Sequence, residues 1–292
     1  MERKTITREE LERFAASVLN KPEDNRFTEE TACAPEDIGA RVYDAPVIFV
    51  GSAEDPLWER IRERKAVGPV WKSPREWLPA ARSVISIFAP FTHHVLASNG
   101  KDPVLTGSAW LSGYNVGGAL IKKTGGETAW WLRELGYQAV CPVVDSHFKS
   151  VSAPDSNPDL PGLSYTSNWS ERHAAFVCGQ GTFGLSRGLI TRRGIAGRFA
   201  SVITDLELPA DERVYTDVYE FCTMCGKCAE NCPAKAISLE EGKKHYPCNM
   251  WLNHMGEVSG VSESCGKCQV NVPCMDRIPA PAFRHLSLLA EE

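Results

Sequence analysis

Eight cysteines lie between residues 222 and 274, and their spacing is the feature of the sequence most able to do chemistry. The run FCTMCGKCAENCP separates its cysteines by two, two and three residues and follows the last with proline, at Cys222, Cys225, Cys228 and Cys232. Bacterial ferredoxins hold a [4Fe-4S] cluster with this run, and its fourth cysteine ligates a second cluster. A second set of cysteines follows along the chain, at Cys248, Cys265, Cys268 and Cys274.

The two sets together supply enough thiolates for two [4Fe-4S] clusters. Crossed ligation predicts that the first cluster is held by Cys222, Cys225, Cys228 and Cys274. The second cluster would then be held by Cys232, Cys248, Cys265 and Cys268. Zinc is the alternative, because paired Cys-x2-Cys groups also form tetrahedral zinc sites. The run of three cysteines followed by Cys-Pro has one thiolate more than a zinc knuckle uses, which favours the clusters.

The composition narrows the classes of function that the chain can have. With 292 residues, 43% of them hydrophobic, the chain is long enough for one large domain and a smaller one. The formal net charge is −5, and no basic cluster is longer than a pair such as Arg192-Arg193. A nucleic-acid binder would carry a basic stripe instead, so we expect no nucleic-acid partner.

The N-terminus and the cysteine usage bear on the compartment. Residues 1–20 follow an amphipathic helical period and lack the uncharged apolar core of a signal peptide. No window approaches the ~18 uninterrupted apolar residues of a membrane span. Cysteines grouped for metal binding suit a compartment that keeps thiols reduced. We therefore expect a cytoplasmic protein that does not interact with a membrane.

The elements that must position the cysteines alternate between helix and strand, which predicts an α/β or α+β domain with a central sheet. Amphipathic periodicity predicts a helix over 6–20, and ETAWWLREL predicts another over 127–135 that ends at Gly136. Short apolar runs with β-branched residues predict strands over 45–51, 83–88 and 137–144. The proline-rich segment 152–162 is expected to be a loop. The composition changes near residue 215, so we expect a cofactor-binding domain over 1–214 and a cysteine-rich domain over 215–292.

A glycine-rich stretch, CGQGTFG at 178–184, spells the Gly-x-Gly-x-x-Gly of a dinucleotide-binding turn. That motif requires a strand before the turn and a helix after it. Here the segment before the turn opens as a helix near Ser170, and residues 185–208 are rich in β-branched residues and glycine. They indicate two strands joined at 194–197, so the sequence argues against NAD as the cofactor.

A family resemblance gives these glycines another use. Glu171-Arg172, the glycine turn, the segment LITRRG, the strand ending at Leu206 and the run CTMCGKCAENCPAKAI together resemble the epoxyqueuosine reductase family, which is related to reductive dehalogenases. The resemblance covers about residues 40–280 in the order of elements. It implies an α+β fold, with a nitroreductase-like cobalamin-binding domain and a C-terminal ferredoxin-like domain that holds two [4Fe-4S] clusters.

The same resemblance implies roles for residues around the turn. Glycine backbone without a Cβ would approach the flat corrin at Gly179, Gly181 and Gly184. The segment Gly184-Leu185-Ser186, followed by Arg187, stands where the family has Gly-Lys-Asn, and Ser186 and Arg187 would contact the corrin there. Tyr165 stands where the family has an aspartate that donates a proton, and is the candidate acid. Reductive dehalogenases are thought to use a tyrosine for this step.

The resemblance leaves several functions open. The first is an iron-sulfur reductase that receives electrons from an external low-potential donor of the ferredoxin or flavodoxin type and reduces a small-molecule or corrinoid substrate at cobalamin. The chain stops at Glu292, soon after the cysteines, which argues against a true epoxyqueuosine reductase acting on tRNA. A non-catalytic electron carrier, or a reductase with FMN in place of cobalamin, would also fit these residues. Outside the clusters we expect structural thiols at Cys33, Cys141 and Cys178.

Overall fold

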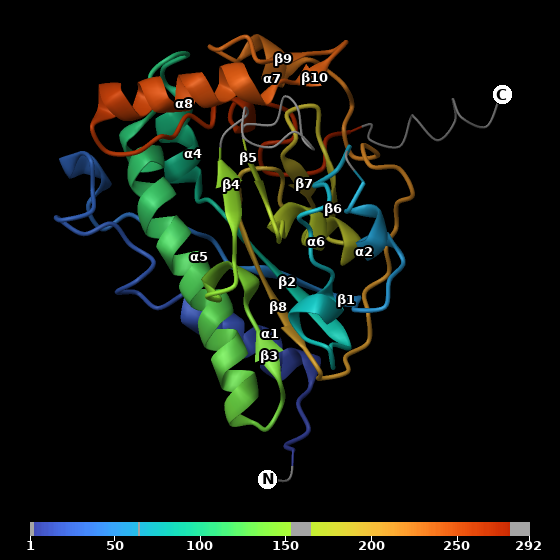
Figure 1. Ribbon diagram of the computed structural model, residues 1–292. Helices are drawn as coiled ribbons and strands as arrows, with labels where there is room; N and C mark the ends of the chain where they lie inside the picture. The colour runs from blue at the N-terminus through green and yellow to red at the C-terminus, as the bar shows by residue number, and fades with distance from the viewer. Residues whose placement is uncertain (1–2, 64, 153–164, 281–292) are drawn as a thin grey trace.

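A four-stranded antiparallel sheet lies at the centre of the protein, and the computed structural model describes residues 3–63, 65–152 and 165–280 around it (Figure 1). The strand order is β1-β2-β8-β3, with bounds Val47–Ser52, Ser83–Pro90, Gly197–Thr204 and Ala139–Val140. The first two predicted strands are confirmed. The third is shorter than predicted, because the chain turns into a 3-10 helix, η2 (Pro142–Val144), at a proline that has no N–H to donate.

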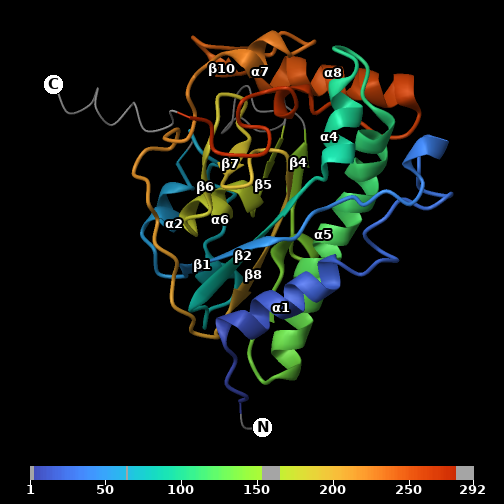
Figure 2. The same cartoon turned by 180° about the vertical axis from the view of Figure 1, so that it is seen from behind.

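Helices cover both faces of this sheet, so the mixed helix and strand content expected from the sequence is confirmed. Helices α1 (Arg8–Leu19) and α5 (Ser108–Glu134) pack on one face, and Figure 2 shows α1 crossing α5. Helix α6 (Glu171–Val177) packs on the other face. In β2, Ile85 and Ile87 belong to the core under α1 and α5, and Val84 belongs to the core under α6. Every residue of β2 is buried because successive side chains point to opposite, covered faces.

The bounds predicted from the sequence agree with the structure for α1 and cover only part of α5. Helix α1 begins after a capping box formed by Thr7 and Glu10, close to the predicted 6–20. Helix α5 has 27 residues, and the predicted 127–135 is only its last part. Its glycines lower helix propensity and hide the rest. At Gly117 an added Cβ would lie 2.5 Å from the Tyr43 hydroxyl, so close packing on the core requires glycine there.

The remaining elements are short and connect or extend this framework. They are η1 (Pro35–Asp37), α2 (Leu57–Arg60), α3 (Pro74–Trp77), α4 (His93–Gly100), β4 (Ser150–Ser152), β5 (Tyr165–Ser167), β6 (Gly181–Phe183), β7 (Leu189–Thr191), α7 (Lys227–Glu230), β9 (Ile237–Ser238), β10 (Gly242–Lys243), α8 (His245–Ser259) and η3 (Lys267–Gln269). Apart from Ser152, the predicted loop over 152–162 lies outside the described residues. No helix among those described combines the length and the apolar character needed to cross a bilayer.

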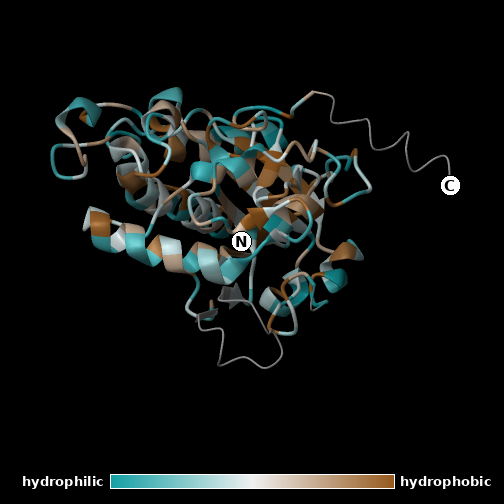
Figure 3. Ribbon diagram, turned by 90° about the horizontal axis from the view of Figure 1, so that it is seen from above, coloured by the Kyte–Doolittle hydropathy of each residue, from teal (hydrophilic) through white to brown (hydrophobic). Residues whose placement is uncertain are grey.

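The cysteine-rich segment lies at one end of the protein, where α8 sits above α4 and the N-terminal end of α5, and α7 lies beside α8 (Figure 1). Seen from above, hydrophobic and hydrophilic residues alternate along α8, which buries only Met255 (Figure 3). A hydrophobic cluster joins Ile190 and Ile195 of the larger part of the chain, before residue 215, to Tyr215, Phe221 and Ile237 of the smaller, cysteine-rich part. The boundary predicted near residue 215 therefore runs through a shared core.

Candidate functional site

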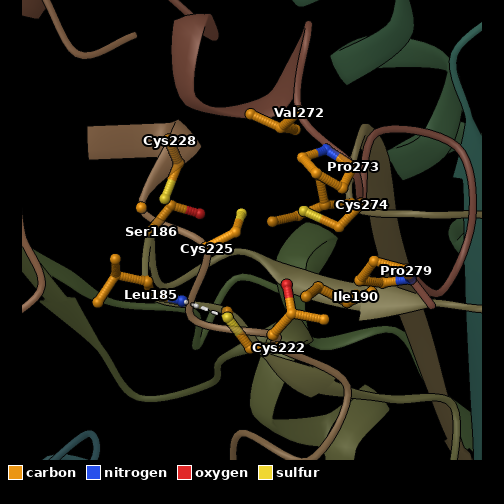
Figure 4. Close-up of a pocket in the computed structure, with 14 residues that line it drawn as sticks. Leu185, Ser186, Ile190, Cys222, Cys225, Cys228, Val272, Pro273, Cys274 and Pro279 are labelled. Carbon is orange, nitrogen blue, oxygen red and sulfur yellow. Dashed lines mark hydrogen bonds between the residues drawn. The ribbon is translucent and has the colours of Figure 1, made fainter. Parts of the chain in front are cut away.

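Four cysteines from distant parts of the chain lie around one cavity. They are the set that crossed ligation predicts for the first cluster, Cys222, Cys225, Cys228 and Cys274. Figure 4 shows Cys222 and Cys225 on the loop that leads into α7 and Cys228 at the start of α7, with Cys274 across the cavity. The loop turns sharply at Gly226, whose φ of +74° suits a residue without a Cβ. Cys274 therefore lies with Cys222, Cys225 and Cys228 in space, although other cysteines separate it from them along the chain.

The other wall of this cavity comes from the glycine-rich stretch and the strands after it. Gly184, Leu185, Ser186, Ile190 and Ile195 line it. The Leu185 N–H donates to the Cys222 Sγ at 3.4 Å, and the Ile195 N–H donates to the Cys274 carbonyl at 2.9 Å. The larger part of the chain thus holds both Cys222 and Cys274, the first and the last cysteines of this set, in place.

The remaining four cysteines share a second neighbourhood. The charge of Cys268 interacts with those of Cys232 and Cys248, and the charge of Cys265 interacts with those of Cys248 and Cys268. Cys248 comes from α8, Cys268 from η3, and Cys232 and Cys265 from loops. The Ala236 N–H donates to the Cys232 Sγ at 3.3 Å. This grouping is the set that crossed ligation predicts for the second cluster.

Burial makes these thiols reluctant to ionise without a metal. It raises the pKa of Cys228 to about 12 and that of Cys274 to about 12, and the neighbouring thiols add to both shifts. Burial also raises the pKa of Cys265 to about 11. Ligands to iron must be thiolates, so loading this site releases protons, and the metal supplies the positive charge that the thiolates need.

The number and type of the donors bear on which metal group this site would hold. Among the residues that the structure describes, no group of three or more Cys, His, Asp or Glu side chains is placed to hold one metal ion. Four thiols around a shared cavity supply the four thiolate ligands that an iron-sulfur cube requires. The residues present therefore fit [4Fe-4S] clusters.

The predicted corrin-contacting glycines each meet protein at the place where a Cβ would stand. At Gly181, in β6, a Cβ would overlap the carbonyl of Ile190 in β7, the strand that pairs with β6. At Gly184 it would come 3.2 Å from the Ile190 side chain, and at Gly179, with φ +85°, it would come 3.2 Å from the Glu212 carbonyl. Packing within the chain therefore requires small residues here, whatever else the turn contacts.

The other residues predicted to act at the cofactor are Ser186, Arg187 and Tyr165, and they lie in different surroundings. Ser186 is buried and lines the cavity of the first cysteine set. Arg187 follows it, exposed, with φ +59°. Tyr165 lies in β5, where it pairs with Ser152 of β4, and its side chain lies outside the described part of the chain.

The three remaining thiols have different surroundings. Cys178 and Cys141 are buried, and burial raises the pKa of both thiols. Cys178 packs between Gly51 and the Val84 carbonyl, in keeping with a structural role. Cys33 is exposed.

One residue within the glycine-rich stretch escaped the sequence analysis. Gln180 is buried, accepts a hydrogen bond from the Ser86 hydroxyl at 2.6 Å and donates to the Val47 carbonyl at 2.7 Å. It therefore links the turn to strands β1 and β2 of the central sheet. A polar residue between two glycines is the only signal in the sequence, and it does not reveal partners more than ninety residues away.

Two titratable groups of α6 are perturbed by burial. Both carboxylate oxygens of Glu171 are buried without a hydrogen-bond partner among the described residues, and burial raises the pKa of Glu171 to about 7. The polar groups of Ser201 and Trp169 offset only part of that shift. Burial and the charge of Arg172 lower the pKa of His173 to about 4, so His173 is neutral at pH 7. Its Nδ1 lies 2.8 Å from the Ser170 hydroxyl.

Comparison with known proteins supports the iron-sulfur assignment. Residues 215–238 match the family of 4Fe-4S binding domains. The tetrachloroethene reductive dehalogenases of Desulfitobacterium hafniense and Dehalobacter restrictus are each 46% identical to this chain over 71 residues. That match covers 24% of this chain and 13% of either relative, so it spans about one eighth of the length of these proteins.

Solved structures similar to this chain are also reductases. An epoxyqueuosine reductase from Streptococcus thermophilus has a TM-score of 0.46 at 16% identity, over 79% of this chain and 63% of its own. A catabolic reductive dehalogenase in complex with 3-bromo-4-hydroxybenzoic acid has a TM-score of 0.48 at 15% identity, over 96% and 38%. The resemblance expected from the sequence is confirmed.

Proposed function

We propose that this protein is an iron-sulfur reductase that passes electrons through two [4Fe-4S] clusters to a cobalamin-type cofactor. The observation that carries the proposal is the gathering of eight cysteines into two crossed sets, the first of them walled by the glycine-rich stretch. The nitroreductase-like character of the larger part, and its use of cobalamin, follow from the resemblance to epoxyqueuosine reductases and reductive dehalogenases. A small-molecule or corrinoid substrate, with an external low-potential electron donor, completes the proposal.

The chain's own residues would prepare this site in three ways. When bound, the clusters supply one-electron transfer and the cobalamin supplies reduction at cobalt. The Leu185 and Ala236 N–H groups donate to ligand sulfurs, and such hydrogen bonds raise the reduction potential of a cluster. The hydrophobic cluster around Ile190 and Ile195 buries Cys222, whereas Cys225 of the same set is exposed. Ser186 lines this cavity and Arg187 follows it in the chain, and we propose that both contact the cofactor.

Proton delivery is assigned to the segment around β5 and α6. Tyr165 in β5 is the proposed donor, at the position where the family carries its acid. Glu171 lies six residues further on, and burial raises its pKa to about 7, so it keeps its proton to a higher pH than a solvated carboxyl group does. Its burial keeps that proton out of solvent. We propose that Glu171 supplies a new proton to Tyr165 after Tyr165 has donated its own. Substituting the two residues singly and together tests whether they act in the same proton transfer.

The experiment that tests the proposal is anaerobic reconstitution followed by metal, sulfide and flavin analysis of the same sample. About eight irons per chain are expected from two clusters. Titration with hydroxocobalamin should then change the cobalt(II) EPR spectrum to that of base-off, protein-bound cobalamin. A free-cobalamin spectrum with eight irons would refute the corrin site. Copurifying flavin would then indicate an FMN enzyme, and its absence an electron carrier.

A further inference from the structure

The cysteine-rich segment contains the same four-residue motif twice, in opposite surroundings. The sequence Cys-Gly-Lys-Cys occurs at 225–228 and at 265–268, and both glycines turn the loop with positive φ, +74° and +68°. The side chain of Lys227 is 46% exposed and lies 2.8 Å from the Glu230 carboxylate. Lys267 is 3% exposed. Identical local sequence thus leads to one solvated and one buried ammonium group.

Lys267 is buried in a cage of neutral oxygens. Its Nζ donates to the carbonyls of Asn99 at 2.7 Å, Leu105 at 2.7 Å and Asp102 at 2.8 Å, and lies 3.0 Å from the Asn99 Oδ1. Only an ammonium group has the three N–H donors that this set requires, so the group carries its positive charge. The Asp102 carboxylate attracts this charge but is not one of the oxygens of the cage, because it accepts from the backbone N–H groups of Val104 and Leu105.

The cage is the turn between α4 and α5, and the same turn holds the second cysteine set directly. The Asn99 Nδ2 donates to the Cys265 carbonyl at 2.8 Å. The Thr106 hydroxyl donates to the Ser264 carbonyl at 2.8 Å, and the Trp110 indole N–H donates to the Ser264 hydroxyl at 3.0 Å. Lys267 is therefore fixed in place between two predicted ligands, Cys265 and Cys268.

We propose that Lys267 is a positioning residue that also raises the reduction potential of the cluster held by the second cysteine set, so that this cluster is the first to be reduced. The inference rests on the proposed function, because it requires both clusters. A cluster that takes up one electron gains one negative charge, and a fixed positive charge in a low-dielectric interior stabilises that product. The charge of Lys227 is screened by solvent and paired with Glu230, so it leaves the first cluster nearly unaffected.

The step is a one-electron reduction and needs no atom transfer. A low-potential donor, dithionite in the experiment, gives up one electron and is oxidised, while the second cluster passes from its oxidised to its singly reduced state. No bond to Lys267 forms or breaks. If this cluster fills first, it would serve as the electron store, and the cluster of lower potential would be the one held beside Gly184 and Ser186.

The test is an EPR-monitored redox titration of the anaerobically purified, cluster-loaded protein. Lys267→Met removes the charge and keeps the length of the side chain, and Lys227→Met is the matched control. We expect Lys267→Met to move one of the two midpoint potentials to a more negative value, and Lys227→Met to move neither. Unchanged potentials in a fully loaded Lys267→Met protein, or equal shifts in both variants, would overturn the proposal.

A second measurement leaves Lys267 in place and so does not depend on how its variant folds. Cys274→Ser removes a ligand of the first set alone, and the remaining cluster should titrate at the higher of the two wild-type midpoints. If it titrates at the lower midpoint, the inference is wrong, although the protein still holds two clusters. If the wild-type protein binds zinc or no iron at all, the proposed function itself fails.

Discussion

The repeated Cys-Gly-Lys-Cys motif allows the same substitution to be made twice, with very different predicted costs. The atoms nearest to a Cβ at Gly226 would belong to the Leu239 side chain, at 3.7 Å or more, which is ordinary contact. A Cβ at Gly266 would overlap the ring of Trp110, which is 1% exposed. The perturbation is therefore Gly266→Ala, and Gly226→Ala is its control.

The structure gives a magnitude for each change. Alanine in the left-handed region costs about 1 kcal/mol at either position. At Gly266 the overlap with a buried indole adds overpacking strain of roughly 2 kcal/mol. Moving the indole also breaks the 3.0 Å hydrogen bond from Trp110 to the Ser264 hydroxyl, which is worth about 1 kcal/mol. We expect a total loss of about 4 kcal/mol for Gly266→Ala and about 1 kcal/mol for the control.

The assay is anaerobic thermal unfolding of the cluster-loaded proteins at one scan rate, followed by tryptophan fluorescence and by the visible absorbance of the clusters. Gly266→Ala should unfold at a clearly lower temperature than Gly226→Ala, and its fluorescence should report the displaced Trp110. Equal unfolding temperatures for the two variants would refute the reasoning that the second motif is packed on α5 and the first is not.

Three further predictions follow from the site. Folding raises the pKa of Glu171 from 4.5 to about 7, so the unfolding free energy of the wild type falls as pH rises through that range. In urea unfolding, the unfolding free energy of Glu171→Gln should therefore rise relative to that of the wild type by up to about 3 kcal/mol between pH 5 and pH 8. A pH-independent difference would contradict this. Gln180→Leu should cost about 2 kcal/mol of unfolding free energy, because it leaves the buried Val47 carbonyl without its donor; a neutral effect would show that water replaces the amide. Cys274→Ser should abolish the same EPR signal as Cys225→Ser and leave about four irons; loss of different signals would refute crossed ligation.

Local sequence was sufficient where chemistry or periodicity is written into neighbouring residues. The Cys222–Cys232 run, the capped helix α1 and the apolar strands β1 and β2 were all predicted. The same holds for the order of helix, turn and two strands around CGQGTFG, which argued against an NAD site. Helix α6 precedes that turn and strands β7 and β8 follow it, as predicted.

Tertiary packing decided what local sequence left open. Helix α5 carries glycines that weaken its signal, yet the core against Tyr43 needs a small residue at Gly117. The glycines of the turn were assigned to a cofactor, and the structure packs each of them against its own chain first. Lys227 and Lys267 sit in identical motifs, so no local pattern separates them. Only the turn between α4 and α5, more than 150 residues upstream, makes one of them buried.

The measurement that tests the central claim most directly is EPR of the reconstituted protein with both clusters loaded and cobalamin poised as cobalt(II). If electrons pass from the first cysteine set to a corrin beside Gly184 and Ser186, reducing the clusters should split or broaden the cobalt(II) signal through spin coupling, and Cys274→Ser should abolish that effect. A cobalt(II) signal that is the same with oxidised and reduced clusters would place the corrin away from the clusters and contradict the account.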